Sequence, residues 1–172
     1  MKGKEKAPTR AAEPRTQYAA LPFRLKPQRE VMLVSSRETK RWVVPKGWPM
    51  KGRKPHAAAA QEALEEAGIV GKVEKKPIGS YHYVKKMRNG AAILCRVDVY
   101  PLEVQRQRKN WPEREERITR WFPIDQAAQA VREPELAKLI QAFVDDRNTP
   151  AGAETQDAAF QDAAFQDAAK VA

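Results

Sequence analysis

The sequence predicts a single α/β domain with a polar tail at each end. Three observations support this prediction. The chain has 172 residues, which suits one domain better than two. Short apolar runs typical of buried strands are interspersed with segments of helical periodicity. The composition also changes towards both ends, where polar or repetitive sequence begins. We therefore predict a globular domain over residues 17–147, with tails at residues 1–16 and 148–172.

The first half of the domain is predicted to hold three strands and one long helix. Residues 17–24 and 30–36 have strand-like composition and are joined by a turn, and residues 41–45 form a short buried strand. A loop then leads to a helix that begins near Pro55, because a proline in the first turn lacks only an N–H that has no partner there. Gly68 is expected to end this helix, because glycine readily adopts the left-handed conformation that follows a helix.

The second half is predicted to hold further strands and two helices. Strands are expected at residues 70–73, 76–87, 91–105 and 117–122. The turn sequence Arg88-Asn89-Gly90 is typical of a tight hairpin, so the strands on either side of it should pair. Helices are expected at residues 123–131 and 134–146. The second of these helices places its apolar residues on one face: Leu136, Leu139, Ile140 and Phe143.

The two tails have compositions that do not favour a packed core. Residues 1–16 are rich in lysine and contain two prolines, so we predict that they are disordered. Residues 148–172 contain a five-residue repeat based on Gln-Asp-Ala-Ala-Phe. A period of five matches neither 3.6 nor 3.5, so its phenylalanines would not form a stripe on a helix. We interpret this segment as a low-complexity tail without chemistry of its own.

Charge and cysteine content restrict the class of partner. The formal net charge is +10, and the two tails carry opposite charges that cancel, so the domain keeps the whole excess. Such a domain favours a polyanion, which could be nucleic acid, an anionic membrane or a highly phosphorylated small molecule. The only cysteine, Cys95, cannot form an internal disulfide. No apolar run approaches a membrane span and no leader sequence is recognisable, so we predict a cytoplasmic protein without membrane association.

Three glutamates on the predicted helix are the most informative feature of the sequence. Glu62, Glu65 and Glu66 are spaced i, i+3 and i+4, which places them on one helix face with neighbouring Cβ atoms roughly 5–6 Å apart. Their mutual repulsion would be removed by a divalent cation, and carboxylate oxygens suit Mg²⁺ or Mn²⁺. The alternative is a solvated acidic face without function. We favour a metal site built on the helix.

The run from Gly47 to Ile69 resembles the Nudix box. That pattern is Gly, five residues, Glu, seven residues, Arg-Glu, an aliphatic residue, any residue, Glu-Glu, any residue, Gly and an aliphatic residue. The positions that match it are Gly47, Glu62, Ala63, Glu65, Glu66, Gly68 and Ile69. The chain departs from it at Arg53, which replaces a Glu, and at Gln61, which replaces the Arg. In the family these two side chains usually pair and brace the loop against the helix.

The resemblance extends over residues 17–145 and is closest to the diphosphoinositol polyphosphate phosphohydrolase branch of the Nudix hydrolases. It is carried by residues 31–37, 41–45 and 117–122 and by Trp111. It implies an α/β/α sandwich with a mixed sheet. It also implies divalent-metal-dependent hydrolysis of phosphoanhydride bonds in inositol pyrophosphates or diadenosine polyphosphates. Lys46-Gly47-Trp48 replaces a triple-glycine stretch of that branch.

The resemblance also implies roles for individual residues. Glu62 and Glu66 would be the primary metal ligands, with Glu65 as a third and the main-chain carbonyl of Gly47 as an additional ligand. One of these three carboxylates, or a metal-bound hydroxide, would deprotonate the attacking water, and Glu66 is our best candidate for this second role. A distal carboxylate often completes such sites, and the sequence leaves three candidates open: Glu113, Glu115 and Glu116.

Basic and hydroxyl side chains near the strand ends and the hairpin are our candidates for substrate binding. They are Arg24, Ser36, Arg37, Arg41, Lys85, Lys86 and Arg88. Arginine suits bidentate phosphate contacts and lysine supplies a point charge. Two alternatives to a small-molecule hydrolase stay open: a pyrophosphohydrolase acting on nucleotides or RNA 5′ ends, and a non-catalytic module that binds phosphate or nucleic acid. Both a monomer and a dimer are compatible with the sequence.

Overall fold

The computed structural model describes residues 13–148 of the chain. The elements in chain order are β1 (Arg15–Arg24), β2 (Glu30–Ser35), β3 (Trp42–Val43), β4 (Lys46–Gly47), α1 (Pro55–Ala67), β5 (Ile69–Val73), β6 (Gly79–Lys86), β7 (Ala92–Gln107), β8 (Thr119–Pro123), α2 (Ile124–Ala130) and α3 (Pro134–Asn148). The C-terminal repeat and most of the predicted N-terminal tail lie outside the described residues. Arg15 and Thr16, which we assigned to that tail, instead begin β1 and pair with β7.

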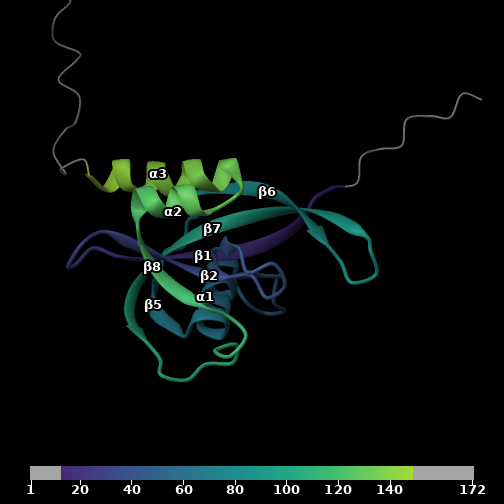
Figure 1. The fold of residues 1–172 in the computed structure, drawn as a ribbon, viewed down its shortest axis with the longest axis horizontal. Coiled ribbons are helices and arrows are strands. Elements are labelled where there is room, and N and C mark those ends of the chain that lie inside the picture. The colour runs from purple at the N-terminus through teal and green to yellow at the C-terminus, as the bar shows by residue number, and fades with distance from the viewer. Residues whose placement is uncertain (1–12, 149–172) are drawn as a thin grey trace, which may run out of the picture.

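All the strands belong to one mixed sheet, as predicted. Its main order is β3-β2-β1-β7-β5, with β4 on β1, β6 on β7 and β8 on β2. β1 and β7 run parallel, and the other pairs are antiparallel. Helices α2 and α3 lie above the sheet and α1 lies below it (Figure 1). The predicted α/β/α sandwich is therefore confirmed.

Two apolar clusters fill the space between the sheet and the helices. Alternating side chains of a strand point to opposite faces, so neighbouring residues of β1 enter different clusters. Ala20 packs with Ala59 and Ala63 of α1, whereas Leu21 packs with Leu136 and Ile140 of α3. The alanines of α1 allow the helix to approach the sheet closely. This close approach brings Glu62 of α1 against Gly47 of β4.

Helix α1 has the ends that the sequence predicts. Pro55 occupies its first turn, and Gly68 follows its last residue with φ 70° in the left-handed region. The Gly68 N–H donates to the carbonyl of Leu64 at 3.0 Å, which satisfies one of the free carbonyls at the helix end. The three glutamates are thereby fixed on one rigid element.

The predicted strand over residues 41–45 is the main difference from expectation. The structure divides this segment into the short strands β3 and β4, which pair with β2 and β1 respectively. Pro45 lies between them and has no N–H for a ladder, although its carbonyl accepts the Ala20 N–H at 3.0 Å. The chain therefore crosses from β2 to β1 here, and this crossing places Gly47 beside α1.

Candidate active site

The glutamates of α1 face the short strand β4. Glu66 is buried, and Glu62 and Glu65 are partly buried. A Cβ atom added to Gly47 would lie only 1.9 Å from Glu62 Oε1, so the Glu62 carboxylate rests directly against the main chain of β4. A side chain at this position would displace that carboxylate. The structure thus places Glu62 beside Gly47, with Glu65 and Glu66 on the same helix, and the metal-ligand role of these four residues stays a prediction.

Burial changes the proton affinity of two of these carboxyls. Burial raises the pKa of Glu62 to about 7, and the nearby charges of Glu65 and Glu113 add to this effect. Burial likewise raises the pKa of Glu66 to about 7, although the cations Arg117 and Lys46 oppose the change. The neighbouring positive charge is therefore too small to keep both carboxylates fully ionised at neutral pH. A bound cation would supply the missing charge.

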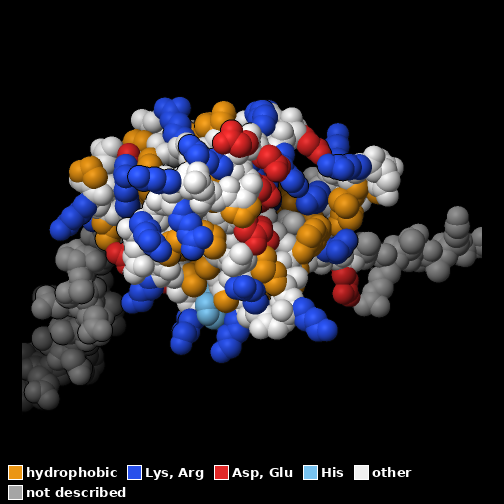
Figure 2. Space-filling view, turned by 90° about the horizontal axis from the view of Figure 1, so that it is seen from below, with side chains coloured by type: hydrophobic (Ala, Val, Ile, Leu, Met, Phe, Trp, Pro, Cys, Tyr) orange, Lys and Arg blue, Asp and Glu red, His pale blue; other side chains and the backbone are white. Residues whose placement is uncertain are grey.

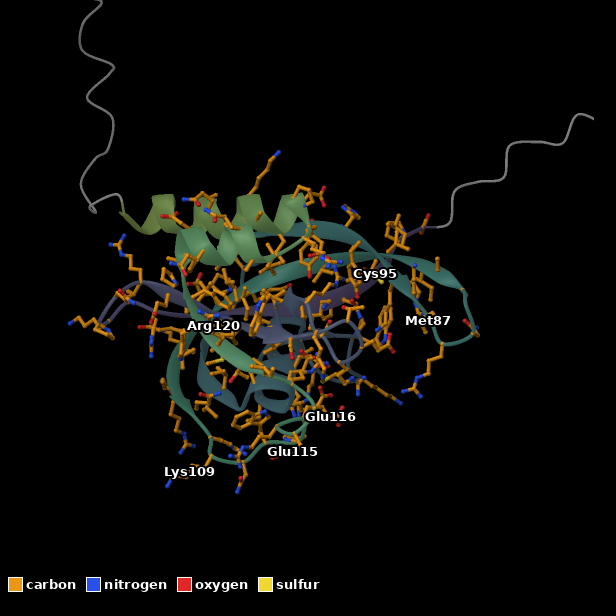
Figure 3. All side chains as sticks on the ribbon, viewed as in Figure 1. Met87, Cys95, Lys109, Glu115, Glu116 and Arg120 are labelled. Carbon is orange, nitrogen blue, oxygen red and sulfur yellow. The ribbon has the colours of Figure 1, made fainter. Side chains whose placement is uncertain are left out.

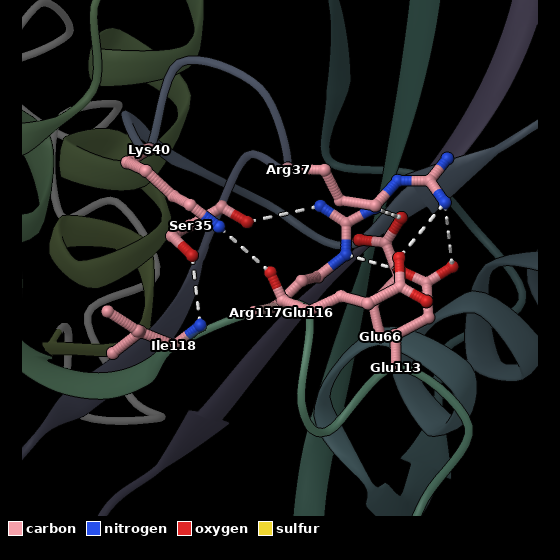
Figure 4. A network of polar contacts seen from close by, with 8 residues as sticks. All are labelled: Ser35, Arg37, Lys40, Glu66, Glu113, Glu116, Arg117 and Ile118. Atoms are coloured by element: carbon pink, nitrogen blue, oxygen red, sulfur yellow. Dashed lines mark hydrogen bonds and ion pairs between the residues drawn. The ribbon is translucent and has the colours of Figure 1, made fainter.

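Arg117 is the central contact of the site and was not among our predicted residues. Its guanidinium donates to Glu66 Oε1 at 2.8 Å, to Glu113 Oε2 at 2.5 Å and to the carbonyl of Ser35 at 3.1 Å. Figure 4 shows this network between the end of β2, helix α1 and the loop before β8. With 32 Lys and Arg in the chain, no local pattern distinguishes this arginine from the others.

The loop between β7 and β8 brings one distal carboxylate to the site. The Glu113 N–H donates to the carbonyl of Glu65 at 3.0 Å, and the Glu113 carboxylate is held by Arg117. Glu116 instead accepts from Arg37 at 3.2 Å. Glu115 is exposed on the same loop, where Figure 3 labels it. Of the three candidates that the sequence left open, Glu113 is the one that the structure places beside the helix glutamates.

This loop is anchored to the C-terminal end of α1. The Arg108 N–H donates to the Gly68 carbonyl at 2.8 Å. The ring of Trp111 covers Gly68 so closely that a Cβ there would lie 2.5 Å from the indole Cε3. The carbonyls of Glu65 and Ala67, which the helix end leaves free, accept from the Glu113 N–H and the Gln107 side-chain amide. These contacts also fix the position of Glu113.

The oxygen donors fit a divalent cation, although they are engaged by side chains. Among residues 13–148, no three His, Cys, Asp or Glu side chains stand ready to hold a metal ion. Arg117 donates to Glu66 Oε1 at 2.8 Å, and Gln61 donates to Glu65 Oε1 at 2.6 Å. Glu66 Oε2, however, is buried without a hydrogen-bond partner. An unsatisfied buried carboxylate oxygen is the kind of hard donor that Mg²⁺ or Mn²⁺ would bind.

The three predicted substrate-binding residues that follow β2 differ in the side chains that they contact. Arg37 is exposed beside Glu113 and Glu116 at the edge of the site. Arg41 is paired with the buried carboxylate of Glu133 at 2.6 Å. The hydroxyl of Ser36 contacts that of Thr39 and accepts the Arg41 N–H, so Ser36 stabilises a turn. Only Arg37 of these three has a side chain beside the carboxylates of the site.

The remaining predicted residues do not form one binding surface. Lys85, Lys86 and Arg88 lie at the hairpin of β6 and β7, near the start of β1, whereas Arg24 lies at the end of β1. β1 is 10 residues long, so at about 3.3 Å per residue its ends are roughly 30 Å apart. Arg24 is also paired with Glu30 and lies 4.2 Å from the Trp121 ring centroid. Arg24 therefore cannot share a small substrate with the hairpin lysines.

Lys46 is a second residue that the sequence analysis missed. Burial lowers the pKa of Lys46, and the charges of Glu66 and Glu133 oppose that change. Its Nζ lies 5.3 Å from the ring centroid of Tyr83. We noted this lysine only as a departure from a glycine stretch, because a chain position gives no indication of burial.

Seen from the side of α1, the surface carries acidic side chains in a central band with Lys and Arg on both sides of it (Figure 2). Hard oxygen donors surrounded by cations can hold a metal ion together with phosphate groups. Within residues 13–148, no helix is both long and apolar enough to cross a membrane.

Comparison with known proteins identifies relatives over most of the domain. The NUDIX domain family matches residues 15–143. Nudix hydrolase 4 of Arabidopsis thaliana is 30% identical over 115 residues, which are 67% of this chain and 54% of that protein. Diphosphoinositol polyphosphate phosphohydrolase 3-beta of Bos taurus is 31% identical over 128 residues, 72% of this chain and 74% of that protein. The chain thus spans about half the length of the first of these relatives. Several Arabidopsis relatives are named as mitochondrial or chloroplastic, and a cytoplasmic location stays a prediction.

Solved structures agree with the fold. A NUDIX hydrolase from Nitrosomonas europaea has a TM-score of 0.61 at 20% identity, covering 78% of this chain and 90% of that one. The C. elegans Ap4A hydrolase has a TM-score of 0.57 at 16% identity, covering 78% of this chain and 99% of that one. The family match spans the sheet, both helix layers and the glutamate site. The chain therefore belongs to the NUDIX domain family.

Proposed function

We propose that this protein is a divalent-metal-dependent hydrolase of phosphoanhydride bonds in a polyphosphorylated small molecule. The observation that carries the proposal is the buried carboxylate of Glu66, whose Oε2 has no hydrogen-bond partner while Glu62 and Glu65 lie on the same helix face. A module that only binds anions gains nothing from buried acidic groups, because they repel the ligand. Such groups are useful where a cation binds together with the phosphates.

The proposed roles follow from the geometry. The carboxylates of Glu62, Glu65 and Glu66 and the carbonyl of Gly47 would hold Mg²⁺ or Mn²⁺, which supplies charge neutralisation on the phosphates when bound. The Glu66 carboxylate is also our candidate for accepting the proton of the attacking water, with Oε2 as the oxygen that would bind the metal. In the metal-free protein burial raises the pKa of Glu66 to about 7, and a bound cation would lower it and keep the carboxylate ionised.

Cations beside the carboxylates would stabilise the transferring phosphoryl group. Negative charge is spread over its equatorial oxygens during attack, so catalysis depends on positioning and electrostatic stabilisation. Arg37 is exposed beside Glu113, and its planar guanidinium suits a phosphate. Lys85 lies at the neighbouring hairpin end of the sheet, where it would contact more distant phosphates.

The substrate class is proposed from both the charge and the relatives. The net charge of +10 favours a strongly anionic ligand. The bovine relative is named for diphosphoinositol polyphosphates, and the structurally similar nematode protein is named for Ap4A. Both names denote compact molecules with several phosphates. We therefore propose an inositol pyrophosphate or a diadenosine polyphosphate as the substrate type.

A panel of substrates tests the proposal. Released phosphate and nucleotides would be measured for a diadenosine polyphosphate series, an inositol pyrophosphate, nucleoside triphosphates and a 5′-triphosphate RNA, with Mg²⁺ and with Mn²⁺. We expect turnover with the compact polyphosphates in either metal and none in EDTA. Preferred cleavage of the RNA would favour the nucleotide and RNA alternative. Binding without turnover of any substrate would favour a non-catalytic module.

A further inference from the structure

A second group of side chains, which includes the predicted substrate-binding residue Lys85, lies next to the proposed metal site and is separate from its carboxylates. The indole of Trp48 has two cations over it: Arg15 Cζ at 4.2 Å and Lys85 Nζ at 5.1 Å from the ring centroid. The three residues come from the start of β1, from the chain just after β4 and from the end of β6. Trp48 directly follows Gly47, so this group is joined to the proposed metal site by one peptide bond.

The sheet topology explains why these residues meet in an open position. Arg15 and Tyr83 are both register partners of Cys95. They therefore lie at the same level of the sheet, on the two strands that flank β7. Tyr83 donates to Gln17 Oε1 at 2.6 Å, so the alternate residues Arg15, Gln17, Tyr83 and Lys85 share one face of the sheet.

Helix α3 covers only the part of this sheet face that lies away from the β6–β7 hairpin. The helix starts beside His82, whose N–H donates to Glu135 at 2.6 Å, and runs towards Phe23, which contacts Phe143. No helix of residues 13–148 therefore lies over the end of the face near the hairpin, and Figure 1 shows the hairpin extending beyond α3.

Among residues 13–148, no ion pair with a carboxylate neutralises the charges of Arg15 and Lys85. Arg24 provides the contrast, because it lies over Trp121 at the same 4.2 Å but is paired with Glu30. The indole attracts both cations through its quadrupole and so holds like charges close together. Two neighbouring cations without a counter-ion form a site for an anion.

We propose that Arg15, Trp48 and Lys85 form a subsite for a phosphate group beyond the bond that is cleaved. Trp48 holds the two cations in place, and the cations bind the phosphate oxygens. Because cations already occupy the indole, the subsite recognises phosphate and not a stacked nucleobase. The protein would thus select substrates by the number of phosphates and not by the base. This proposal rests on the proposed function only for the identity of the bond that is cleaved.

Binding in the absence of metal tests the subsite separately from hydrolysis. The affinity of the whole chain for inorganic tripolyphosphate would be measured by calorimetry in EDTA. We expect Arg15→Gln and Lys85→Gln each to weaken binding at least fivefold. Trp48→Leu should weaken it to a similar extent, and Trp48→Phe should restore most of the affinity because it keeps an aromatic face.

Arg120→Gln is the matched control, since Arg120 is also an exposed arginine over an aromatic ring. It lies on the other side of the molecule from Met87 and Cys95 (Figure 3).

The outcomes separate the subsite from the proposed function. Equal affinity for tripolyphosphate and ATP supports the subsite. If ATP instead binds at least tenfold more tightly than tripolyphosphate, and only Trp48→Leu removes this difference, the base stacks on Trp48 and the proposal is overturned. Equal loss in Arg15→Gln and Arg120→Gln would also overturn it. With metal, Arg15→Gln should raise KM for long polyphosphates with little change in kcat. Intact tripolyphosphate binding without hydrolysis of any substrate would refute the proposed function and leave the subsite standing.

Discussion

Replacing Glu66 by glutamine should stabilise the metal-free protein at alkaline pH while removing its activity. The carboxyl of Glu66 is 5% exposed, and burial raises its pKa from 4.5 to about 7. The folded state therefore binds a proton more tightly than the unfolded state between these two values. Stability falls as the pH rises through this window, and above pH 7 the full cost of the buried charge is present.

The size of this effect follows from the change in pKa. Each pH unit corresponds to about 1.4 kcal/mol, so raising the pKa from 4.5 to about 7 costs roughly 3 kcal/mol of unfolding free energy at pH 8. The attraction of Arg117 is already included in that pKa. Glutamine carries no charge and should recover most of this cost, which corresponds to an increase in Tm of roughly 5–10 °C. At pH 5 the difference should shrink to about 1 kcal/mol or less.

Thermal unfolding in EDTA at pH 5 and pH 8 measures the difference. Glu103→Gln is the control, because Glu103 is exposed on β7 away from the site. Saturating Mg²⁺ should stabilise the wild type much more than Glu66→Gln, and the variant should lose at least a hundredfold in turnover. A variant that is less stable than the wild type at pH 8 in EDTA would refute the reasoning. It would mean that the ion pair with Arg117 outweighs the burial of the charge.

Three substitutions and one pH titration test other parts of the site. Arg117→Met leaves two carboxylates without their buried partner, so denaturant unfolding in EDTA should show a loss of about 3–5 kcal/mol, partly reversed by Mg²⁺. Gly47→Ala should keep the fold, as judged by circular dichroism, but displace Glu62 and weaken Mn²⁺ binding in a paramagnetic titration at least tenfold. Gly68→Ala should destabilise the protein by about 1 kcal/mol or more, because φ 70° strains alanine and its Cβ meets Trp111. Metal affinity should increase as the pH rises through about 7, since the two buried glutamates must lose their protons first; a pH-independent affinity would contradict their role as ligands.

The sequence alone predicted the features that depend on local geometry. The spacing of Glu62, Glu65 and Glu66 places them on one face of any helix, and Pro55 and Gly68 define the ends of this one by their backbone preferences. The order of strands and helices likewise follows from periodicity. The segment around Pro45 was predicted less well, because the partner of a strand depends on residues that are distant in the chain.

The tertiary structure decided which charges meet. Arg117 is 51 positions from Glu66 and 82 from Ser35, and no periodic pattern relates residues at such separations. Packing also separated Arg24 from Lys85, joined Arg15 to Trp48, and selected Glu113 from three neighbouring glutamates. Helix geometry is set by the chemistry of neighbouring residues, whereas burial and ion pairing arise only when the sheet brings distant segments together. For that reason the sequence located the three glutamates and proposed Arg37, whereas it gave no indication of Arg117 or of the burial of Lys46.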